Sequence, residues 1–411
     1  MILHAPIIKK NNESVIISSR FELHSALANI PEALYYRFPE RYEPFLCLNA
    51  DGFAATALLV AMYTGEDLTI RAPISPKLAY GLIEYRNVFH TWLPKIFRMV
   101  NIQYQNFEKP TQKTGDGAVA SAFSGGVDSF FTLWSHLPEN QAIPDARITH
   151  GLFIHGYDLR LDEEDVYQAI AQKYSALFQN LNLELILAST NAYQFSQFRI
   201  DWSLFHGAPL IGAALLLSPL LQRFYVPAGY VYDGLIPQGS SVLVDHLLST
   251  ENVDIVHHGT STNRFEKITT LTKWPLTYSH LRVCANKHQS SELKNCSRCH
   301  KCIRTMAALT ILNALPNYST FSSELSLGDY FRWGLQTHMS PIFAGEIRRR
   351  AWKAGKICLA LKVWIAITIH GMVKFVLTLI KLFLPQKLLY QIKSKLLKPE
   401  VDEEGISNDH P

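Results

Sequence analysis

Cysteine is scarce in this chain: only six of its 411 residues are cysteines, and they are not spread along the sequence in pairs. A secreted protein stabilised by disulfides would instead show a framework of paired cysteines. The N-terminus also lacks the apolar core of a signal peptide, because Lys9 and Lys10 are followed by a polar run over residues 11–13. The sequence therefore predicts a cytoplasmic protein.

Charged residues are also few, at 18%, whereas 48% of the residues are hydrophobic, so the chain can fill sizeable cores. A length of 411 residues favours two or three domains. We expect an N-terminal α+β domain over 1–115, a central α/β domain over 116–315 and a C-terminal helical segment over 316–411. The first of these carries no recognisable chemistry.

A glycine turn lies where an apolar run over 118–123 ends and a helical pattern begins; its sequence is Ser124-Gly125-Gly126-Val127-Asp128-Ser129. Two glycines allow positive φ and a close approach of backbone N–H groups to an anion, and the helix start adds the positive end of its dipole. The carboxylate of Asp128 is compatible with phosphate if it holds Mg²⁺. The alternative is a plain strand-to-helix loop in which serine caps the helix. The lysine of the GxxxxGK[ST] loop is missing, which excludes that motif.

Four of the six cysteines fall in one short segment: Cys296, Cys299 and Cys302 form a CxxCxxC run, and Cys284 lies upstream. Four thiolates at such spacing can close a tetrahedral Zn²⁺ site of the structural type. An iron–sulfur cluster suits the same spacing, and unrelated buried thiols are the third reading.

The Ser124–Ser129 segment resembles the SGGxDS loop of the PP-loop ATP pyrophosphatases, which cleave ATP to AMP and pyrophosphate. The order Arg264-x-Glu266, Cys284 and CxxCxxC followed by Ile303-Arg304 is similar to the 7-cyano-7-deazaguanine synthase (QueC) branch, which has a four-cysteine zinc site. The gap between Cys284 and Cys296 is longer than in that family, and Arg264 replaces a usual lysine. The resemblance covers residues 117 to 306 and implies a PP-loop (HUP-like) fold.

Three residues are the expected catalytic residues: Asp128, Arg264 and Lys267. Positive side chains near the phosphates stabilise the charge that develops during ATP cleavage, and the resemblance places Arg264 in that role. Lys267 is expected to act beside it, the alternative being that it only flanks a helix. Asp128 would hold Mg²⁺. The expected nucleotide-binding residues are Ser124, Gly125, Gly126, Val127, Asp128, Ser129, His155 and Asp158. The expected cofactors are ATP, Mg²⁺ and Zn²⁺.

The central region alternates strand-like and helical patterns, which is typical of a doubly wound parallel sheet. We expect strands at 118–123, 151–154, 183–188, 224–226 and 254–256, and helices over 163–180 and 208–217. Farther upstream we expect strands at 35–39, 45–48 and 68–70, helices at 53–62 and 76–92 (the second capped by Ser75), and a linker over 105–117. The rim at the carboxyl ends of the central strands would then carry Ser124, His155, Thr190, Asn191, Ala228, Gly229, His257 and His258. Candidates for holding a substrate amine or carboxylate are Asp201, His206, Asp233 and Asp245.

The C-terminal region is apolar and basic. Residues 343–398 contain twelve lysines or arginines against one acid, Glu346, and acidic residues follow from Glu400 onward. The apolar stretch 357–384 is interrupted by lysines, so it lacks the uninterrupted run of about 20 apolar residues that a conventional span requires. Lys356, His370, Lys374 and Lys381 share one helix face, which favours a helix at the membrane surface with Trp352 and Trp364 as anchors. A helix packed on the protein's own core, a homo-oligomer contact and a true span are the alternatives.

These patterns together predict an ATP-dependent, AMP-forming ligase that joins an amine or ammonia to an activated carboxylate or carbonyl of a small molecule. One alternative is a tRNA or small-molecule sulfur transferase with an iron–sulfur cluster, so nucleic acid stays open as a partner. Cys47 and Cys358 are the only cysteines outside the cluster, which weakens sulfur transfer. The other alternative is a non-catalytic nucleotide-binding module at a membrane.

Overall fold

The structure, a computed structural model, describes residues 1–11, 13–25, 30–109, 117–196, 200–284, 293–322, 324–336 and 339–383. The chain divides into two units, Met1–Ser323 and Glu324–Pro411. Most of the expected linker over 105–117 and the expected acidic tail beyond Glu400 lie outside the described residues. Gln105–Phe107, which the linker was expected to include, belongs to a strand instead.

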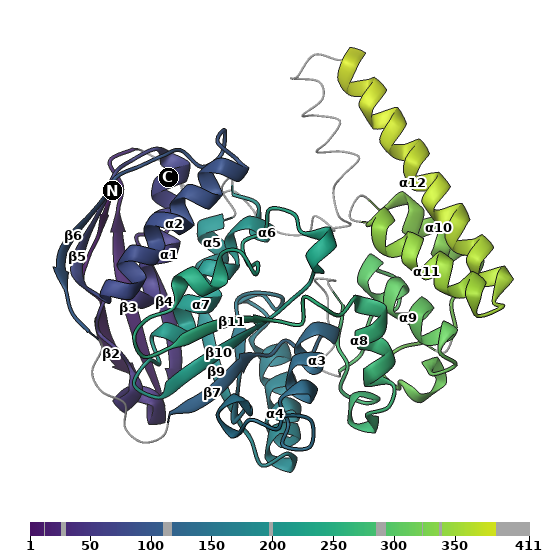
Figure 1. The fold of residues 1–411 in the computed structure, drawn as a ribbon, viewed down its shortest axis with the longest axis horizontal. Helices are drawn as coiled ribbons and strands as arrows, with labels where there is room; N and C mark the ends of the chain where they lie inside the picture. Colours follow the sequence, from purple (N-terminus) through teal and green to yellow (C-terminus); the bar gives the residue numbers. More distant parts are fainter. Residues whose placement is uncertain are drawn as a thin grey trace, which may run out of the picture. The chain divides into compact units, whose positions relative to one another are not determined.

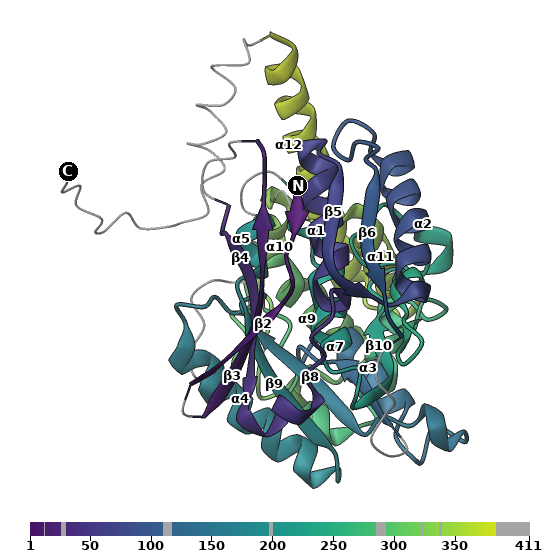
Figure 2. The ribbon, with the colours of Figure 1, turned by 90° about the vertical axis from the view of Figure 1, so that its left-hand side faces the viewer.

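The first unit is built on one mixed, mostly parallel sheet of eleven strands (Figures 1 and 2). The order is β11-β10-β7-β8-β9-β4-β3-β1-β5-β6, and β2 pairs with β3 off this path. The strands are β1 Ile2–Leu3, β2 Ile7–Asn11, β3 Ser14–Glu22, β4 Ala33–Pro39, β5 Leu68–Ile74, β6 Ile102–Phe107, β7 Ala118–Ala122, β8 His150–His155, β9 Glu184–Thr190, β10 Leu221–Pro227 and β11 Asp254–His258.

The central strands have the topology of a doubly wound sheet. From β7 the chain passes to β8 and β9 on one side, and it then returns to β10 and β11 on the other side of β7, all five strands being parallel. The direction of winding reverses between β7 and β10, and ligands of such sheets bind at this switch point, beyond the carboxyl ends of the strands. The predicted α/β class is confirmed in this form.

The helices of the first unit lie on both sides of the sheet (Figure 1). They are α1 Asp51–Thr64, α2 Pro76–Trp92, α3 Val127–Ser135, α4 Glu164–Asn180, α5 Ala192–Ser196, α6 Trp202–Phe205, α7 Gly207–Leu215, α8 Arg264–Leu271 and α9 His300–Ile311. The described residues of this unit also form six short 3-10 helices: η1 Glu40–Phe45, η2 Pro144–Ala146, η3 Tyr232–Gly234, η4 Asp245–Leu248, η5 Pro275–Thr277 and η6 Leu315–Asn317.

The N-terminal strands and the central strands share one core. β4 pairs antiparallel with β9, and the apolar helix α1 packs against α7 at a close crossing. That crossing requires glycine, because a Cβ on Gly52 would lie 2.4 Å from Leu216 and one on Gly212 would lie 2.2 Å from the carbonyl oxygen of Gly52. The two regions are therefore parts of one packed body, and a domain boundary near residue 115 stays a prediction.

Two local expectations in this region are wrong. The strand expected at 45–48 is absent, because Pro44 lies inside η1 and the chain leaves the helix in an irregular conformation. Ser75 does not cap α2 with its side chain; its hydroxyl donates to Glu251 instead, and Pro76 begins the helix.

The second unit contains three described helices, α10 Leu327–Leu335, α11 Pro341–Lys353 and α12 Ile357–Phe383. Both α10 and α11 pack against α12, and Gly355 with φ +71° turns the chain between α11 and α12. His370 is buried in this unit, with Nδ1 3.3 Å from the carbonyl oxygen of Gly334. His370 therefore belongs to the packed face of α12, and its expected place on an exposed cationic stripe is wrong. The side chain of Lys381 lies outside the described residues.

Candidate active site

The Ser124–Ser129 segment forms a tight turn between β7 and α3. Gly125 has φ +75°, and a Cβ at this position would lie 1.7 Å from the hydroxyl of Tyr174, so only glycine fits. The hydroxyl of Ser129 donates to the carbonyl oxygen of Gly126 at 3.0 Å, which fixes the first turn of α3. The turn therefore presents the N-terminus of a helix at the carboxyl end of a strand, a geometry that suits an anion.

This turn opens into a cavity of about 290 Å³ at the switch point of the sheet. The ends of β7, β8 and β10 contribute Ala122, Phe153 and Val226 to its walls. Its polar lining residues include Ser124, Asp128, Ser129, Tyr157, Asp158, His206, Ser240, Arg264, Arg282, Lys301 and Arg304. Four cationic side chains thus share one small cavity with two carboxylates.

The carboxylate of Asp128 is held by two cations from α8. Arg264 donates from Nη1 to Oδ2 at 2.5 Å, and Nζ of Lys267 lies 3.3 Å from Oδ1. Burial raises the pKa of the Asp128 carboxyl, but the charges of Arg264 and Lys267 outweigh burial and hold that pKa at about 2. Lys267 is buried and also donates to the carbonyl oxygen of Ala228 at 2.6 Å, so this charge is fixed in place.

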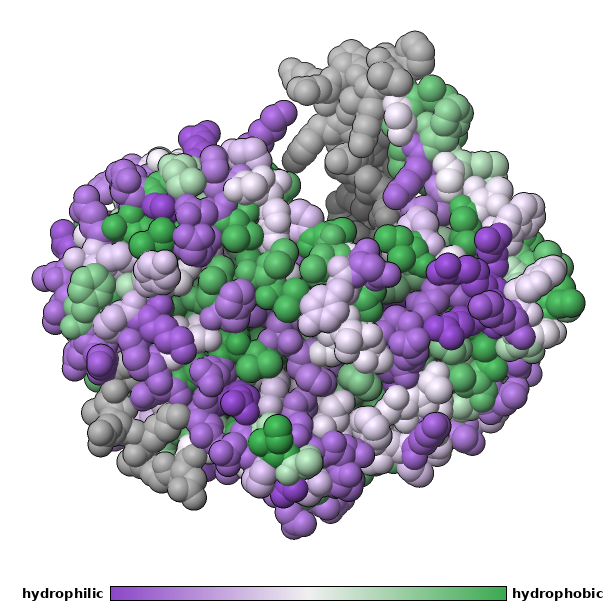
Figure 3. Space-filling view, in the orientation of Figure 1, coloured by the Kyte–Doolittle hydropathy of each residue, from purple (hydrophilic) through white to green (hydrophobic). Residues whose placement is uncertain are grey.

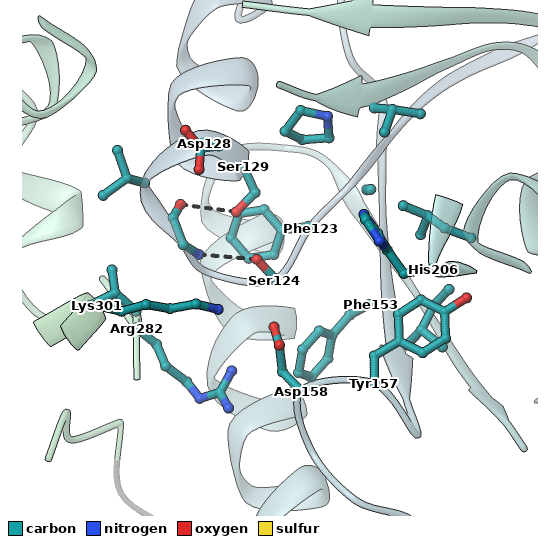
Figure 4. A pocket seen from close by; sticks show the side chains of 18 of the residues that line it. Phe123, Ser124, Asp128, Ser129, Phe153, Tyr157, Asp158, His206, Arg282 and Lys301 are labelled. Carbon is teal, nitrogen blue, oxygen red and sulfur yellow. Dashed lines mark hydrogen bonds between the residues drawn. The ribbon is translucent and has the colours of Figure 1, made fainter. Parts of the chain in front are cut away.

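A second carboxylate lies at the mouth of the cavity. Asp158 follows β8, and Figure 4 shows its side chain turned toward the ends of Lys301 and Arg282, with the hydroxyl of Ser124 close by. Desolvation raises the pKa of Asp158, but the charges of Lys301 and Arg282 lower it below its ordinary value. Asp158 is therefore ionised near neutral pH.

The four cysteines lie close enough to hold one metal ion. The Sγ atoms of Cys284, Cys296, Cys299 and Cys302 all lie within 4.8 Å of one another, and Cys296 and Cys302 are 3.8 Å apart. A tetrahedral site with Zn–S bonds of about 2.3 Å has sulfur–sulfur distances of about 3.8 Å, so the cluster fits zinc. The backbone N–H of Cys299 donates to Sγ of Cys296 at 3.3 Å, which favours a thiolate there.

The cluster is held by Asn295, a residue that the sequence did not single out. Its side-chain oxygen accepts from the backbone N–H groups of Val283 and Cys284, and its amide nitrogen donates to the carbonyl oxygen of Leu281. Asn295 is buried, so one amide side chain joins the two arms that carry the cysteines. The Cys284 arm is also tied to the glycine turn, because the N–H of Arg282 donates to the carbonyl oxygen of Gly125 at 2.8 Å.

The cysteine cluster and the cavity are continuous. Cys284 itself lines the cavity, Arg282 precedes it by two residues, Lys301 lies between Cys299 and Cys302, and Arg304 follows them. A metal at the cysteines would thus fix the backbone that carries three of the four cations. Arg282, Lys301 and Arg304 were not among the predicted site residues, although each lies within two residues of a cysteine, which was a usable signal.

Some predicted site residues are not brought to the cavity. His155 is buried and stacks on Tyr167, with ring centroids 4.3 Å apart. Asp201 caps α6, and Asp245 is buried against His257 at 2.7 Å. Of the rim residues, only Ser124 lines the cavity. Also missing from its lining are Gly125, Lys267, Thr190, Asn191, Ala228, Gly229, Asp233 and His258. Lys267 still contacts Asp128, and the candidate His206 is part of the lining.

Comparison of the chain with family models, with curated proteins and with solved structures gave no match.

Proposed function

We propose that this chain is a cytoplasmic, ATP-dependent, AMP-forming enzyme of the PP-loop ATP pyrophosphatase type, and that it acts on a small-molecule substrate. The observation that carries the proposal is that the glycine turn at 124–129 and four cations line the same cavity. Four positive charges against two carboxylates leave an excess that a polyphosphate would neutralise. The similarity of the loop and of the cysteine segment to the PP-loop enzymes supports the same conclusion.

The phosphates of ATP would lie on the N-terminus of α3, with the hydroxyls of Ser124 and Ser129 as further donors. Arg264, Arg282, Lys301 and Arg304 line the same space and would neutralise the charge that develops as pyrophosphate leaves. An oxygen of the substrate would attack the α-phosphorus and displace pyrophosphate, and an amine or ammonia would then displace AMP. His206 and Ser240 line the cavity and would help to orient that substrate.

Asp128 and Asp158 are the carboxylates that could ligate Mg²⁺, since Mg²⁺ prefers carboxylate and phosphate oxygens. Bound Mg²⁺ would supply charge neutralisation between the phosphates. Asp128 is already paired with Arg264 and Lys267, so its first role is to fix those two cations beside the turn. Asp158, which is exposed, is the more accessible ligand.

Equilibrium binding of ATP to the zinc-loaded full-length protein tests this proposal without knowledge of the second substrate. Replacing Lys301 by Gln removes one charge from the cavity, and a charged hydrogen bond contributes about 1.5 to 3 kcal/mol. The dissociation constant should therefore rise by about 10- to 150-fold.

The matched control is Lys95→Gln, because Lys95 is an exposed lysine of the same unit outside the cavity. Equal ATP affinity in the two variants, or no ATP binding by the unaltered protein, would contradict the proposal.

A further inference from the structure

The second unit exposes an apolar face along α12. Its exposed apolar side chains recur at helical spacing and form one stripe: Ile357, Leu361, Trp364, Met372, Phe375 and Leu379. The opposite face packs within the unit, where Val363, Ala366 and Ile369 are buried. Figure 3 shows apolar side chains at the surface of this helix, at the upper right. A helix that is apolar on both faces needs a second apolar environment besides its own core.

A groove with cationic walls lies beside this stripe, between α11 and α12. It has a volume of about 510 Å³ and is lined by Arg348, Arg349, Trp352, Lys353, Ala360, Leu361 and Trp364. Trp352 and Trp364 are 61% and 51% exposed, so both indole rings are available to a partner. Three cations and two tryptophans around one apolar groove match an anionic head joined to an apolar chain.

The net charge of α11 and α12 is positive. Between Pro341 and Ile380 there are seven lysines or arginines and a single acid, Glu346, which pairs with Arg350 at 3.7 Å. Lys362 and Lys374 project on either side of the apolar stripe, as their positions at 100° per residue require. The apolar surface is thus bordered by positive charge.

We propose that the groove between α11 and α12 binds an anionic phospholipid, and that the stripe of α12 lies in the surface of the bilayer. The phosphate would meet Arg348, Arg349 and Lys353, and the acyl chain would lie along Leu361 between the two tryptophans. Tryptophan is enriched at this depth of a membrane, and each nearby cation adds attraction to an anionic surface.

The positive charges argue against two alternatives, namely a dimer through the stripe and a membrane-spanning α12. A second copy docking through the same stripe would bring Lys362, Lys374 and the arginines of the groove against an equally positive surface, which opposes association. The segment Ile357–Ile380 is long and apolar enough to cross a membrane by composition alone, with 22% of its apolar window buried. A crossing helix would place Lys362 and Lys374 in the hydrocarbon, whereas a helix in the interface leaves them at the headgroups.

The test is flotation of the full-length protein with vesicles of phosphatidylcholine, with and without phosphatidylglycerol. Binding should require the anionic lipid and weaken with salt. The double variant Arg348→Gln/Arg349→Gln should bind about 30-fold more weakly, because two cations contribute about 1 kcal/mol each and 1.36 kcal/mol is tenfold. The matched control, Lys95→Gln/Lys109→Gln, removes two exposed lysines of the first unit and should bind normally.

A second pair of variants tests the stripe. Met372→Gln/Phe375→Gln should lose binding that persists at high salt, whereas Met99→Gln/Phe107→Gln, at similarly exposed positions of the first unit, should not. Three results would overturn the proposal. Equal binding to both kinds of vesicle would show that no anionic lipid is recognised, and resistance to extraction by alkaline carbonate would indicate a spanning helix. Absence of vesicle binding, together with a dimer that Phe375→Gln dissociates, would show that the stripe contacts a second copy of the chain. The readout is membrane binding, so it is independent of ATP cleavage.

Discussion

Replacing Asp128 by Asn should destabilise the contact between α3 and α8 as well as the ATP site. The carboxylate is 21% exposed and pairs with Arg264 and with Lys267, which is 2% exposed. Its pKa is lowered from 3.8 to about 2, which corresponds to about 2 kcal/mol of stability near neutral pH. The variant also leaves Lys267 buried without its carboxylate, and breaking a buried pair in this way costs about 3 to 5 kcal/mol.

The measurement is hydrogen exchange of the backbone amides in α3 and α8 of the zinc-loaded protein, which reports the local free energy of opening. We expect a loss of about 3 kcal/mol in Asp128→Asn, and a smaller loss in Asp128→Asn/Lys267→Met, because the second change removes the uncompensated charge. The matched control is Asp162→Asn, which removes an exposed Asp–Arg pair and should cost no more than about 1 kcal/mol. Equal losses in Asp128→Asn and Asp162→Asn would show that Asp128 contributes no more than an exposed ion pair. Additive effects of the two changes at Asp128 and Lys267 would show that the two side chains are not coupled.

The protein should bind one Zn²⁺ per chain. Elemental analysis should find that Cys299→Ser has lost the zinc and that Cys358→Ser retains it, since Cys358 lies outside the cluster. Iron and sulfide in place of zinc would favour the sulfur-transfer alternative. Gly125→Ala forces a Cβ to within 1.7 Å of Tyr174 and should weaken ATP binding at least tenfold, whereas Gly345→Ala, which meets open space, should leave calorimetric affinity unchanged. Burial, with the charges of His136 and Lys267, lowers the pKa of His258 from 6.5 to about 3, so the unfolded chain takes up this proton first as the pH falls. The free energy of unfolding should therefore decrease as the pH falls from 6.5 to 3. Urea titrations at several pH values should show a smaller decrease in His258→Gln than in the unaltered protein. The same decrease in both proteins would contradict this prediction.

The central part of the fold could be predicted because its strands are short, continuous apolar runs and because α4 repeats apolar residues at helical spacing. The runs 151–154 and 254–256 read directly as strands, and the pattern from 163 to 180 as a helix. The strand Ser14–Glu22 was missed although its residues alternate between partly exposed and buried positions, with Val15, Ile17 and Phe21 facing the core. The pairing of β4 with β9 joins residues about 150 positions apart, and no local pattern contains that information.

Only those residues of the candidate site that belong to a recognisable sequence motif could be predicted. The glycine turn and the cysteines could be found from their residue types and spacing. Arg282 could not, because its place in the cavity depends on tertiary contacts: Asn295 binds the carbonyl oxygen of Leu281, and the N–H of Arg282 donates to Gly125. His155 is the last residue of β8, and its ring stacks on Tyr167 and is buried in the core. Tertiary packing of this kind decides which residues after a strand face a ligand.

The most direct test of the central claim is the identity of the products that the zinc-loaded protein forms from ATP labelled in its γ-phosphate. The protein would be incubated with Mg²⁺ and a library of small-molecule carboxylates and carbonyl compounds, together with ammonia. We expect labelled pyrophosphate and an equal amount of AMP, both lost in Lys301→Gln and retained in Lys95→Gln. Labelled inorganic phosphate with an equal amount of ADP would contradict this claim.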